Sequence, residues 1–196
     1  MSSQVSNTVP LHGAGRELNG RQAETVGRLV AAALDEVRAV GFELLTVRSV
    51  AARATVAPAT AYTYFASKNH LVAEVFWREL QRLPRAEQTD GASAAQRVRA
   101  VFRQLADFLG DEPALASAVT VALLGGEPDV KRLRLVIGGE INERLREALG
   151  EDVSALEVLS LAWSGAMLQA GMGHTTYAQM GDQLVRVTDL VLEEQR

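Results

Sequence analysis

The chain has 196 residues, of which 47% are hydrophobic and 22% charged, a composition typical of a globular protein with a well-buried core. It contains no cysteine, which excludes disulfide bridges, thiolate metal sites and a cysteine nucleophile. The net charge of −4 argues against a general nucleic-acid binder. However, residues 1–80 carry eight Lys and Arg against seven Asp and Glu, whereas residues 81–196 carry twelve against seventeen. The charge distribution therefore permits DNA binding at the N-terminal end.

Residues 1–20 lack both a basic start and a long apolar core, so we expect no signal peptide. Their Ser, Asn, Gly and Pro content predicts a flexible arm instead. No run of about 18 apolar residues occurs, and no membrane span is expected. These features are compatible with a cytoplasmic protein, which is the location that we predict.

Apolar residues recur at helical spacing along most of the chain, and no segment alternates as a strand would. We therefore predict an all-α fold of about nine helices. Gly41 suits a left-handed helix end, Thr46 and Ser67 are good N-caps, and Pro58 suits a first helical position. The predicted helices span residues 21–40, 47–54, 58–64, 68–83, 94–110, 113–124, 128–149, 153–172 and 177–194.

Residues 84–93 are polar, rich in turn formers and have little to bury, so they form the best domain boundary. The prediction is a small N-terminal helical domain at 21–83 and a larger helical domain at 84–196, preceded by the arm at 1–20.

Residues 45–75 carry the clearest functional signal. They contain two short helices joined by a tight turn, then an aromatic pair and a capped helix that opens on a lysine. This layout is typical of a helix-turn-helix, whose second helix enters the major groove of DNA. The motifs are TVRSVA at 46–51, TAYTYF at 60–65, and SK at 67–68 followed by Leu71. On these motifs, residues 21–80 resemble the DNA-binding domain of the TetR family of bacterial transcription regulators.

The resemblance implies contacts with DNA for eight residues. They are Thr46, Arg48, Pro58, Ala59, Thr60, Tyr62, Tyr64 and Lys68. Tyr62, Tyr64 and Lys68 are expected on phosphates, and Thr60 on a base edge, with Pro58 and Ala59 against a thymine methyl. Phe65 is expected to turn inward. The alternative without DNA contact is that both tyrosines close the small helical core and that Lys68 is solvated.

Three features depart from the family pattern. Thr55 stands where the family usually has Gly, which predicts a strained turn, and Ala57 replaces a Ser that would cap the helix. The recognition helix also lacks the Arg, Asn and Gln side chains that contact bases in pairs. Because those side chains are missing, DNA shape is expected to carry part of the recognition.

Arg16 and Arg21, in and next to the N-terminal arm, are further candidates for contact along the DNA duplex.

For residues 84–196 the resemblance implies a ligand-binding and dimerisation domain. The apolar side chains there suit an ordinary core as well as a cavity for a small hydrophobic effector. The candidate lining residues are Phe102, Leu105, Phe108, Leu123, Ile137, Met167 and Met172. The candidate polar anchors are Glu140, Asn142, Gln169 and His174.

The last two predicted helices are apolar on two faces, and a helix with two apolar faces needs two partners. A symmetry mate is one source of the second partner, and a larger monomeric core is the other. The first choice predicts a homodimer that binds a palindromic operator and releases it when the effector binds.

No cofactor, metal site or catalytic site is expected. His12, His70 and His174 show no metal-ligand spacing, and no nucleophile elbow, phosphate-binding loop or dinucleotide fingerprint occurs. The competing interpretation is an all-α ligand-binding protein whose helix-turn-helix has degenerated.

Overall fold

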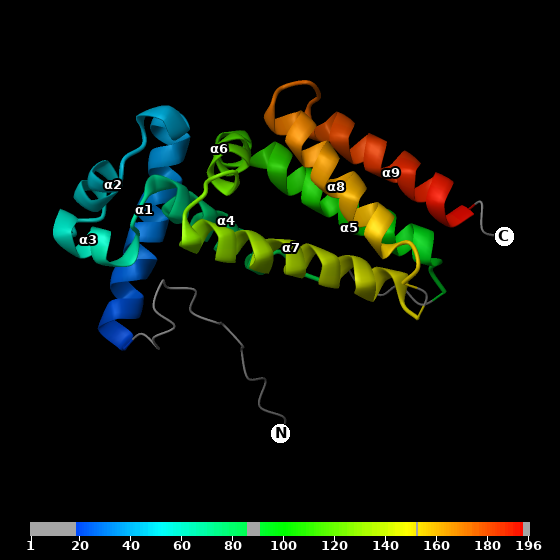
Figure 1. Cartoon of the computed structure of the whole chain (residues 1–196), viewed down its shortest axis with the longest axis horizontal. Coiled ribbons are helices and arrows are strands. Elements are labelled where there is room, and N and C mark those ends of the chain that lie inside the picture. The colour runs from blue at the N-terminus through cyan, green and yellow to red at the C-terminus, as the bar shows by residue number, and fades with distance from the viewer. Residues whose placement is uncertain (1–18, 86–90, 152, 194–196) are drawn as a thin grey trace.

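The computed structural model describes residues 19–85, 91–151 and 153–193, and every regular element in these residues is an α-helix (Figure 1). The predicted all-α fold is therefore confirmed. Most of the predicted arm, with Arg16, lies outside the described residues. The helices are α1 (Gly20–Leu44), α2 (Val47–Arg53), α3 (Pro58–Tyr64), α4 (Lys68–Arg82), α5 (Ala94–Asp111), α6 (Pro113–Leu123), α7 (Pro128–Leu149), α8 (Leu156–Gly171) and α9 (Tyr177–Glu193).

Side-chain caps set several helix starts. Thr46, Ser67 and Ser93 each accept a hydrogen bond from a backbone N–H three residues further on, which satisfies one of the unpaired amides of the first turn. One predicted start was wrong, because α8 begins at Leu156 rather than at residue 153. Residues 153–155 form a turn, which the Leu156 N–H closes by donating to the Val153 carbonyl at 3.0 Å.

The end of α1 also differs from the prediction. Gly41 has φ of 71°, as expected of a left-handed residue, but the chain resumes helical geometry and α1 ends at Leu44. Gly41 is thus a kink inside the helix. Its freedom from a Cβ is needed here because an L side chain is strained at this φ.

Figure 1 shows α1, α2 and α3 together at one end of the molecule and α5, α7, α8 and α9 at the other, with α4 and α6 between them. We call α1–α3 the head and α5–α9 the body. Helix α4 is buried along most of its length, against α1, α6 and α7. One continuous apolar core runs from the head into the body. The division into domains at 84–93 therefore stays a prediction. The head meets the body through α4, which packs on α6 and α7, and through α1, which packs directly on α6. Among the described helices, none combines the length and apolar character needed to cross a bilayer.

Candidate nucleic-acid interface

Helix α2 begins with a reciprocal cap between Thr46 and Ser49. The Ser49 N–H donates to the Thr46 hydroxyl at 2.9 Å, and the Thr46 N–H donates to the Ser49 hydroxyl at 3.3 Å. This cap fixes the first turn of α2, on which Thr46 and Arg48 are both exposed. Thr46 and Arg48, two of the eight residues for which the resemblance implies contact with DNA, therefore lie at one ordered turn.

The turn from α2 to α3 is closed by a pair of backbone hydrogen bonds. The Thr55 N–H donates to the Ala52 carbonyl at 3.1 Å, and the Val56 N–H donates to the Ala51 carbonyl at 2.9 Å. This Schellman arrangement requires a left-handed residue, and Thr55 supplies it with φ of 55°. A β-branched side chain is unfavourable in that conformation. The strained turn predicted from the missing glycine is thus confirmed.

Helix α3 exposes its first turn and is anchored by Ala61 and by Phe65, the residue that follows it. Ala57 precedes it without a side-chain cap, as predicted. Ala61 and Phe65 are fully buried, so the expected inward orientation of Phe65 is confirmed. The exposed residues of the first turn are Pro58, Ala59 and Thr60. A recognition helix reaches base edges with this turn, and the contact of these three residues with bases stays a prediction.

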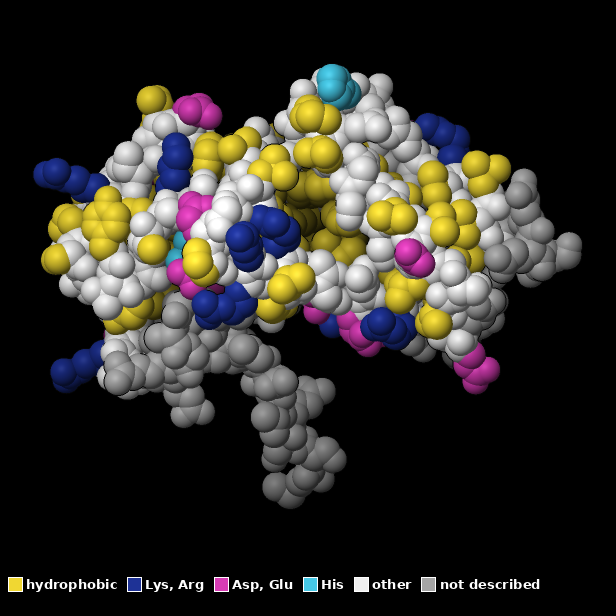
Figure 2. Space-filling view, in the orientation of Figure 1, with side chains coloured by type: hydrophobic (Ala, Val, Ile, Leu, Met, Phe, Trp, Pro, Cys, Tyr) yellow, Lys and Arg dark blue, Asp and Glu magenta, His cyan; other side chains and the backbone are white. Residues whose placement is uncertain are grey.

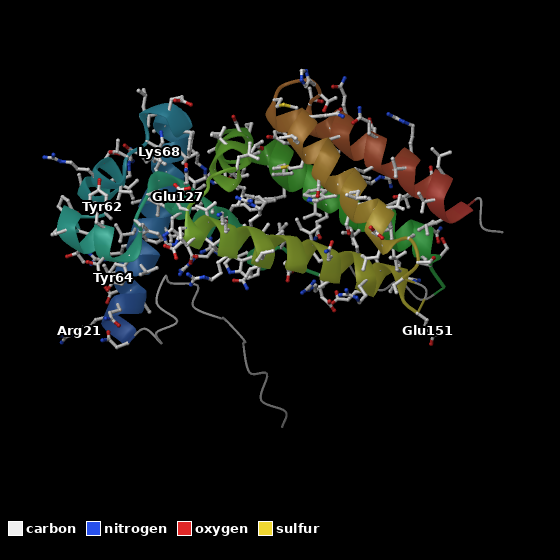
Figure 3. The ribbon with its side chains drawn as sticks, in the orientation of Figure 1. Arg21, Tyr62, Tyr64, Lys68, Glu127 and Glu151 are labelled. Atoms are coloured by element: carbon white, nitrogen blue, oxygen red, sulfur yellow. The ribbon has the colours of Figure 1, made fainter. Side chains whose placement is uncertain are left out.

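The two tyrosines of α3 lie in different surroundings. Tyr62 is 52% exposed, which removes the alternative that it closes the head core, whereas Tyr64 is half-buried and packs against that core. Figure 3 shows both residues, with Arg21, along the end of the molecule formed by α3 and the start of α1. Phosphate contacts from these residues stay a prediction.

Lys68 is bound within the protein rather than extended into solvent. Its ammonium donates to the carbonyl oxygens of Phe42 at 3.0 Å and Glu43 at 3.3 Å, and it lies 4.3 Å from the centre of the Phe42 ring. The ammonium therefore caps the last carbonyls of α1, where positive charge is favoured. The alternative of an idle, solvated lysine is excluded.

An ion pair joins α2 to α1. The Arg53 guanidinium donates to the Glu36 carboxylate at 2.7 Å, and this bond lowers the pKa of Glu36 although burial opposes it. Because Arg53 is held in this way, it fixes the position of the helix-turn-helix on α1.

The body contains a hollow with hydrophobic walls, bounded by α6, α7 and α8 (Figure 2). Of the predicted lining residues, Phe102, Leu105 and Ile137 are buried, whereas Leu123 and Met167 are half-buried against the core. The structure brings these five into the body core. Their contact with a ligand stays a prediction.

Two predicted lining residues, Met172 and Phe108, lie apart from the five in the body core. Met172 is 54% exposed, because it lies at the C-cap beyond the end of α8. Phe108 pairs with Phe76 of α4 at 5.8 Å between ring centres, and it lines an open groove of about 640 Å³ beside α4 whose other residues are mostly charged. An aromatic residue that the sequence did not single out as lining is Trp163, which stacks on Phe102 with 6.3 Å between ring centres.

The predicted polar anchors for a ligand are either bonded to other protein side chains or exposed on the surface. Glu140 accepts hydrogen bonds from Arg144 and Arg85, and Asn142 accepts one from Ser160 at 2.6 Å. Gln169 and His174 are exposed. These contacts explain Glu140 and Asn142 without a ligand.

Helix α8 has one buried and one exposed apolar face, as predicted for these residues. Leu159 and Trp163 are buried. The exposed large apolar residues of the opposite face are Val158 (49%), Leu161 (67%) and Leu168 (40%), spaced as one stripe with Gly165 between them. We call Val158, Leu161, Gly165 and Leu168 the α8 stripe.

Comparison with known proteins agrees with this geometry. The family model described as "Bacterial regulatory proteins, tetR family" matches residues 29–75, which include all of α2 and α3. The HTH-type transcriptional regulator Rv0767c of Mycobacterium tuberculosis is 41% identical over 202 aligned positions, which cover 98% of this chain and 94% of that protein.

Two solved structures share the fold. A TetR transcriptional regulator from Rhodococcus sp. RHA1 aligns with a TM-score of 0.73 and 24% identity, covering 88% of this chain and 97% of the other. Thermus thermophilus FadR, a TetR-family transcriptional repressor in complex with lauroyl-CoA, aligns with a TM-score of 0.58 and 20% identity, covering 83% and 92%.

Proposed function

Because this chain belongs to the TetR family of bacterial regulatory proteins, we propose that it is a homodimeric repressor that releases a palindromic operator when a small amphipathic effector binds the body. As a transcription regulator it acts by binding DNA. The cytoplasmic location stays a prediction that follows from this role.

The observation that carries the proposal is the exposed first turn of α3, held beside the capped first turn of α2. Pro58, Ala59 and Thr60 offer two apolar surfaces and one hydroxyl to the major groove, while Thr46 and Arg48 face one side of it. Since this surface has few hydrogen-bonding groups, phosphate contacts and DNA shape supply a large share of the affinity and specificity.

The α8 stripe supports the homodimer. Three large apolar side chains exposed on one helix face favour a second apolar surface as cover, and the same stripe on a second copy is self-complementary around a two-fold axis. Gly165 in the middle of the stripe lets the two helices approach closely. Two heads held in this way match two successive major grooves of a palindrome.

The hollow supports an effector with an apolar part and an anionic part. Its walls are hydrophobic, and Figure 2 shows Lys and Arg side chains beside it, over the beginning of α7. Lys131 and Arg134 are the exposed cations of that part of α7. FadR of Thermus thermophilus, which shares this fold, is described with lauroyl-CoA bound. An acyl-CoA combines an apolar chain with phosphates and is therefore the first effector class to test.

The test begins with the DNA upstream of the gene itself. Purified protein should retard a fragment of that region, and Tyr62→Ala with Lys68→Ala should abolish the retardation while the chain stays folded and dimeric. Lauroyl-CoA, laurate and free CoA are then added separately to the complex. If lauroyl-CoA releases the DNA and neither laurate nor free CoA does, the site needs both the acyl chain and the CoA part of the effector. If laurate releases the DNA by itself, the site binds simple fatty acids.

The competing function, an all-α ligand carrier with a degenerate helix-turn-helix, is favoured by the strained Thr55 turn and the uncapped α3. It predicts ligand binding without any DNA retention. Failure to retard any upstream fragment, with lauroyl-CoA still bound, would establish the carrier and refute the repressor.

A further inference from the structure

Arg144 of α7 lies buried against the C-terminal end of α4. Only 3% of this residue is exposed. One terminal nitrogen donates to the carbonyl oxygens of Leu80 and Leu83, each at 3.0 Å, and the other donates to the Pro84 carbonyl at 3.0 Å. The Nε–H donates to Glu140 at 2.8 Å, which holds the guanidinium plane in place. A single side chain of the body thus binds the Leu80 carbonyl in the last turn of α4 and the carbonyls of Leu83 and Pro84 directly after that helix.

The opposite end of α4 is tied to the segment that leads into α7. The Asn69 amide donates to the Glu127 carboxylate at 2.8 Å. This contact depends on Gly125, because a Cβ there would lie 2.4 Å from a Glu127 oxygen and 3.0 Å from the Asn69 nitrogen. The close approach of the two polar groups therefore requires a residue without a side chain.

Two residues after Glu127, in the first turn of α7, Asp129 faces His70 across the same junction. The His70 Nδ1 lies 3.8 Å from an Asp129 oxygen, and its ring packs edge-on against Phe65, the residue that follows α3. Asp129 is held in turn by Arg132 at 2.9 Å. The N-terminal end of α4 thus connects α7 with the end of the recognition helix.

Since α4 and α7 lie side by side and are joined at both ends (Figure 1), α4 has no free end about which to pivot on α7. We propose that Arg144 is the positioning residue that joins α4 to α7, so that these two helices move as one rigid unit and a displacement of α7 moves the head. This proposal builds on the proposed function, in which an effector that binds beside α7 releases the operator. Its physical basis is that packed helices shift as units rather than deform continuously.

The first experiment needs no effector. The chain has no native cysteine, so Ala52→Cys on α2 and Ala178→Cys on α9, both exposed, accept spin labels without background. Labelled chains are diluted with unlabelled ones, and the distance distribution within a chain is measured for the wild type, Arg144→Met and Arg97→Met. Arg97 is the matched control, because its guanidinium also donates to carbonyl oxygens, those of Ala148 and Ala92, but only within the body and the segment before α5.

Arg144→Met should broaden or shift the distribution, whereas Arg97→Met should leave it as in the wild type. An unchanged distribution in Arg144→Met would overturn the proposal. Should Arg144→Met not fold, Arg144→Lys and Asn69→Ala replace it, since each loosens one end of α4 while retaining most of the contacts. Wild-type distributions in both of these would overturn the proposal equally.

The second experiment measures coupling with lauroyl-CoA as the probe. In the wild type the ratio of operator Kd with and without the probe is expected to lie in the range of about 5–150 that is common for coupled sites. In Arg144→Met that ratio should fall towards one although each ligand still binds alone. A ratio equal to that of the wild type would contradict the proposal. If lauroyl-CoA leaves even the wild type unaffected, the proposed effector is wrong, and the distance measurement still decides the role of Arg144.

Discussion

The ammonium of Lys68 lies 3.0 Å from the carbonyl oxygen of Phe42 and 4.3 Å from the centre of the ring of the same residue. One cation at the start of α4 therefore stabilises the C-terminal end of α1, directly after the Gly41 kink. The carbonyls of Phe42 and Glu43 occupy two of its three N–H donors, and the third remains for a DNA phosphate. Lys68 is thus placed to serve both the fold and the interface.

Lys68→Met should have two separable effects. The loss of the cap should lower the free energy of unfolding by about 1–2 kcal/mol, measured by urea titration. The loss of a phosphate contact in each protomer should make the slope of log K against log salt shallower by about 0.9 for each protomer, measured by fluorescence anisotropy on the operator. A lower stability with an unchanged salt slope would mean that Lys68 acts only within the protein.

Thr55→Gly should stabilise the protein. Glycine takes the left-handed conformation without steric cost, so relief of strain should outweigh the greater freedom of the unfolded chain, for a net gain of about 0.5–1 kcal/mol. The matched control is Ala52→Gly, inside α2, which should lower stability by about the same amount. Denaturant midpoints of the two variants check the prediction, and a loss in both would show that Thr55 is unstrained.

Local signals made much of the fold predictable from the sequence. The capping residues Thr46 and Ser67, Pro58 at the start of α3, and the apolar spacing of the long helices depend on neighbours a few residues away. The same is true of the strained Thr55 turn, where an expected glycine is missing. Helix starts without a side-chain cap were harder to place, as the late start of α8 at Leu156 shows.

Stability should decrease as the pH falls through the titration range of His70. Burial lowers the pKa of His70 below its usual value of about 6.5, although the Asp129 carboxylate opposes the shift. When the pH is lowered below about 6.5, the histidine of the unfolded chain takes up a proton, whereas the buried His70 of the folded chain resists protonation. The free energy of unfolding therefore decreases as the pH is lowered.

His70→Gln should remove this part of the pH dependence, which amounts to at most about 1.4 kcal/mol per pH unit. Urea unfolding between about pH 7.5 and about pH 5.5, one unit either side of the usual histidine pKa, measures it. The exposed His174, changed to Gln, serves as the control. Equal slopes in His70→Gln and the wild type would show that His70 does not titrate differently on unfolding.

Leu161→Asp should convert the dimer into a monomer. Leu161 is the most exposed large apolar residue of the α8 stripe at 67%, whereas Leu135 of α7 is 77% exposed outside it. Leu135→Asp therefore introduces the same charge at a leucine that is at least as exposed, and it should leave the dimer intact. Light scattering after size-exclusion chromatography distinguishes the two masses. A dimeric Leu161→Asp would place the interface elsewhere.

Long-range contacts could not be predicted. Arg144 and Pro84 are separated by 60 residues, and Lys68 and Phe42 by 26, and nothing in either local segment indicates that their side chains meet. Long cationic side chains suit a solvated surface, a phosphate contact and a buried cap equally well. The predicted ligand-lining residues were uncertain for the same reason, because helical spacing alone does not say which neighbouring helix faces Phe108 or Met172.

In the proposed function this protein binds DNA as a dimer, with two α3 helices in successive major grooves. Chemical footprinting on the upstream fragment that the wild type retards shows whether it does. We expect two protected major-groove segments that are related by a two-fold axis and centred about 10 base pairs, one helical turn, apart. Both segments should disappear with Tyr62→Ala and with Leu161→Asp, and both should remain with Leu135→Asp. A single protected segment that persists in Leu161→Asp, or the absence of protection on any upstream fragment, would contradict the proposed function.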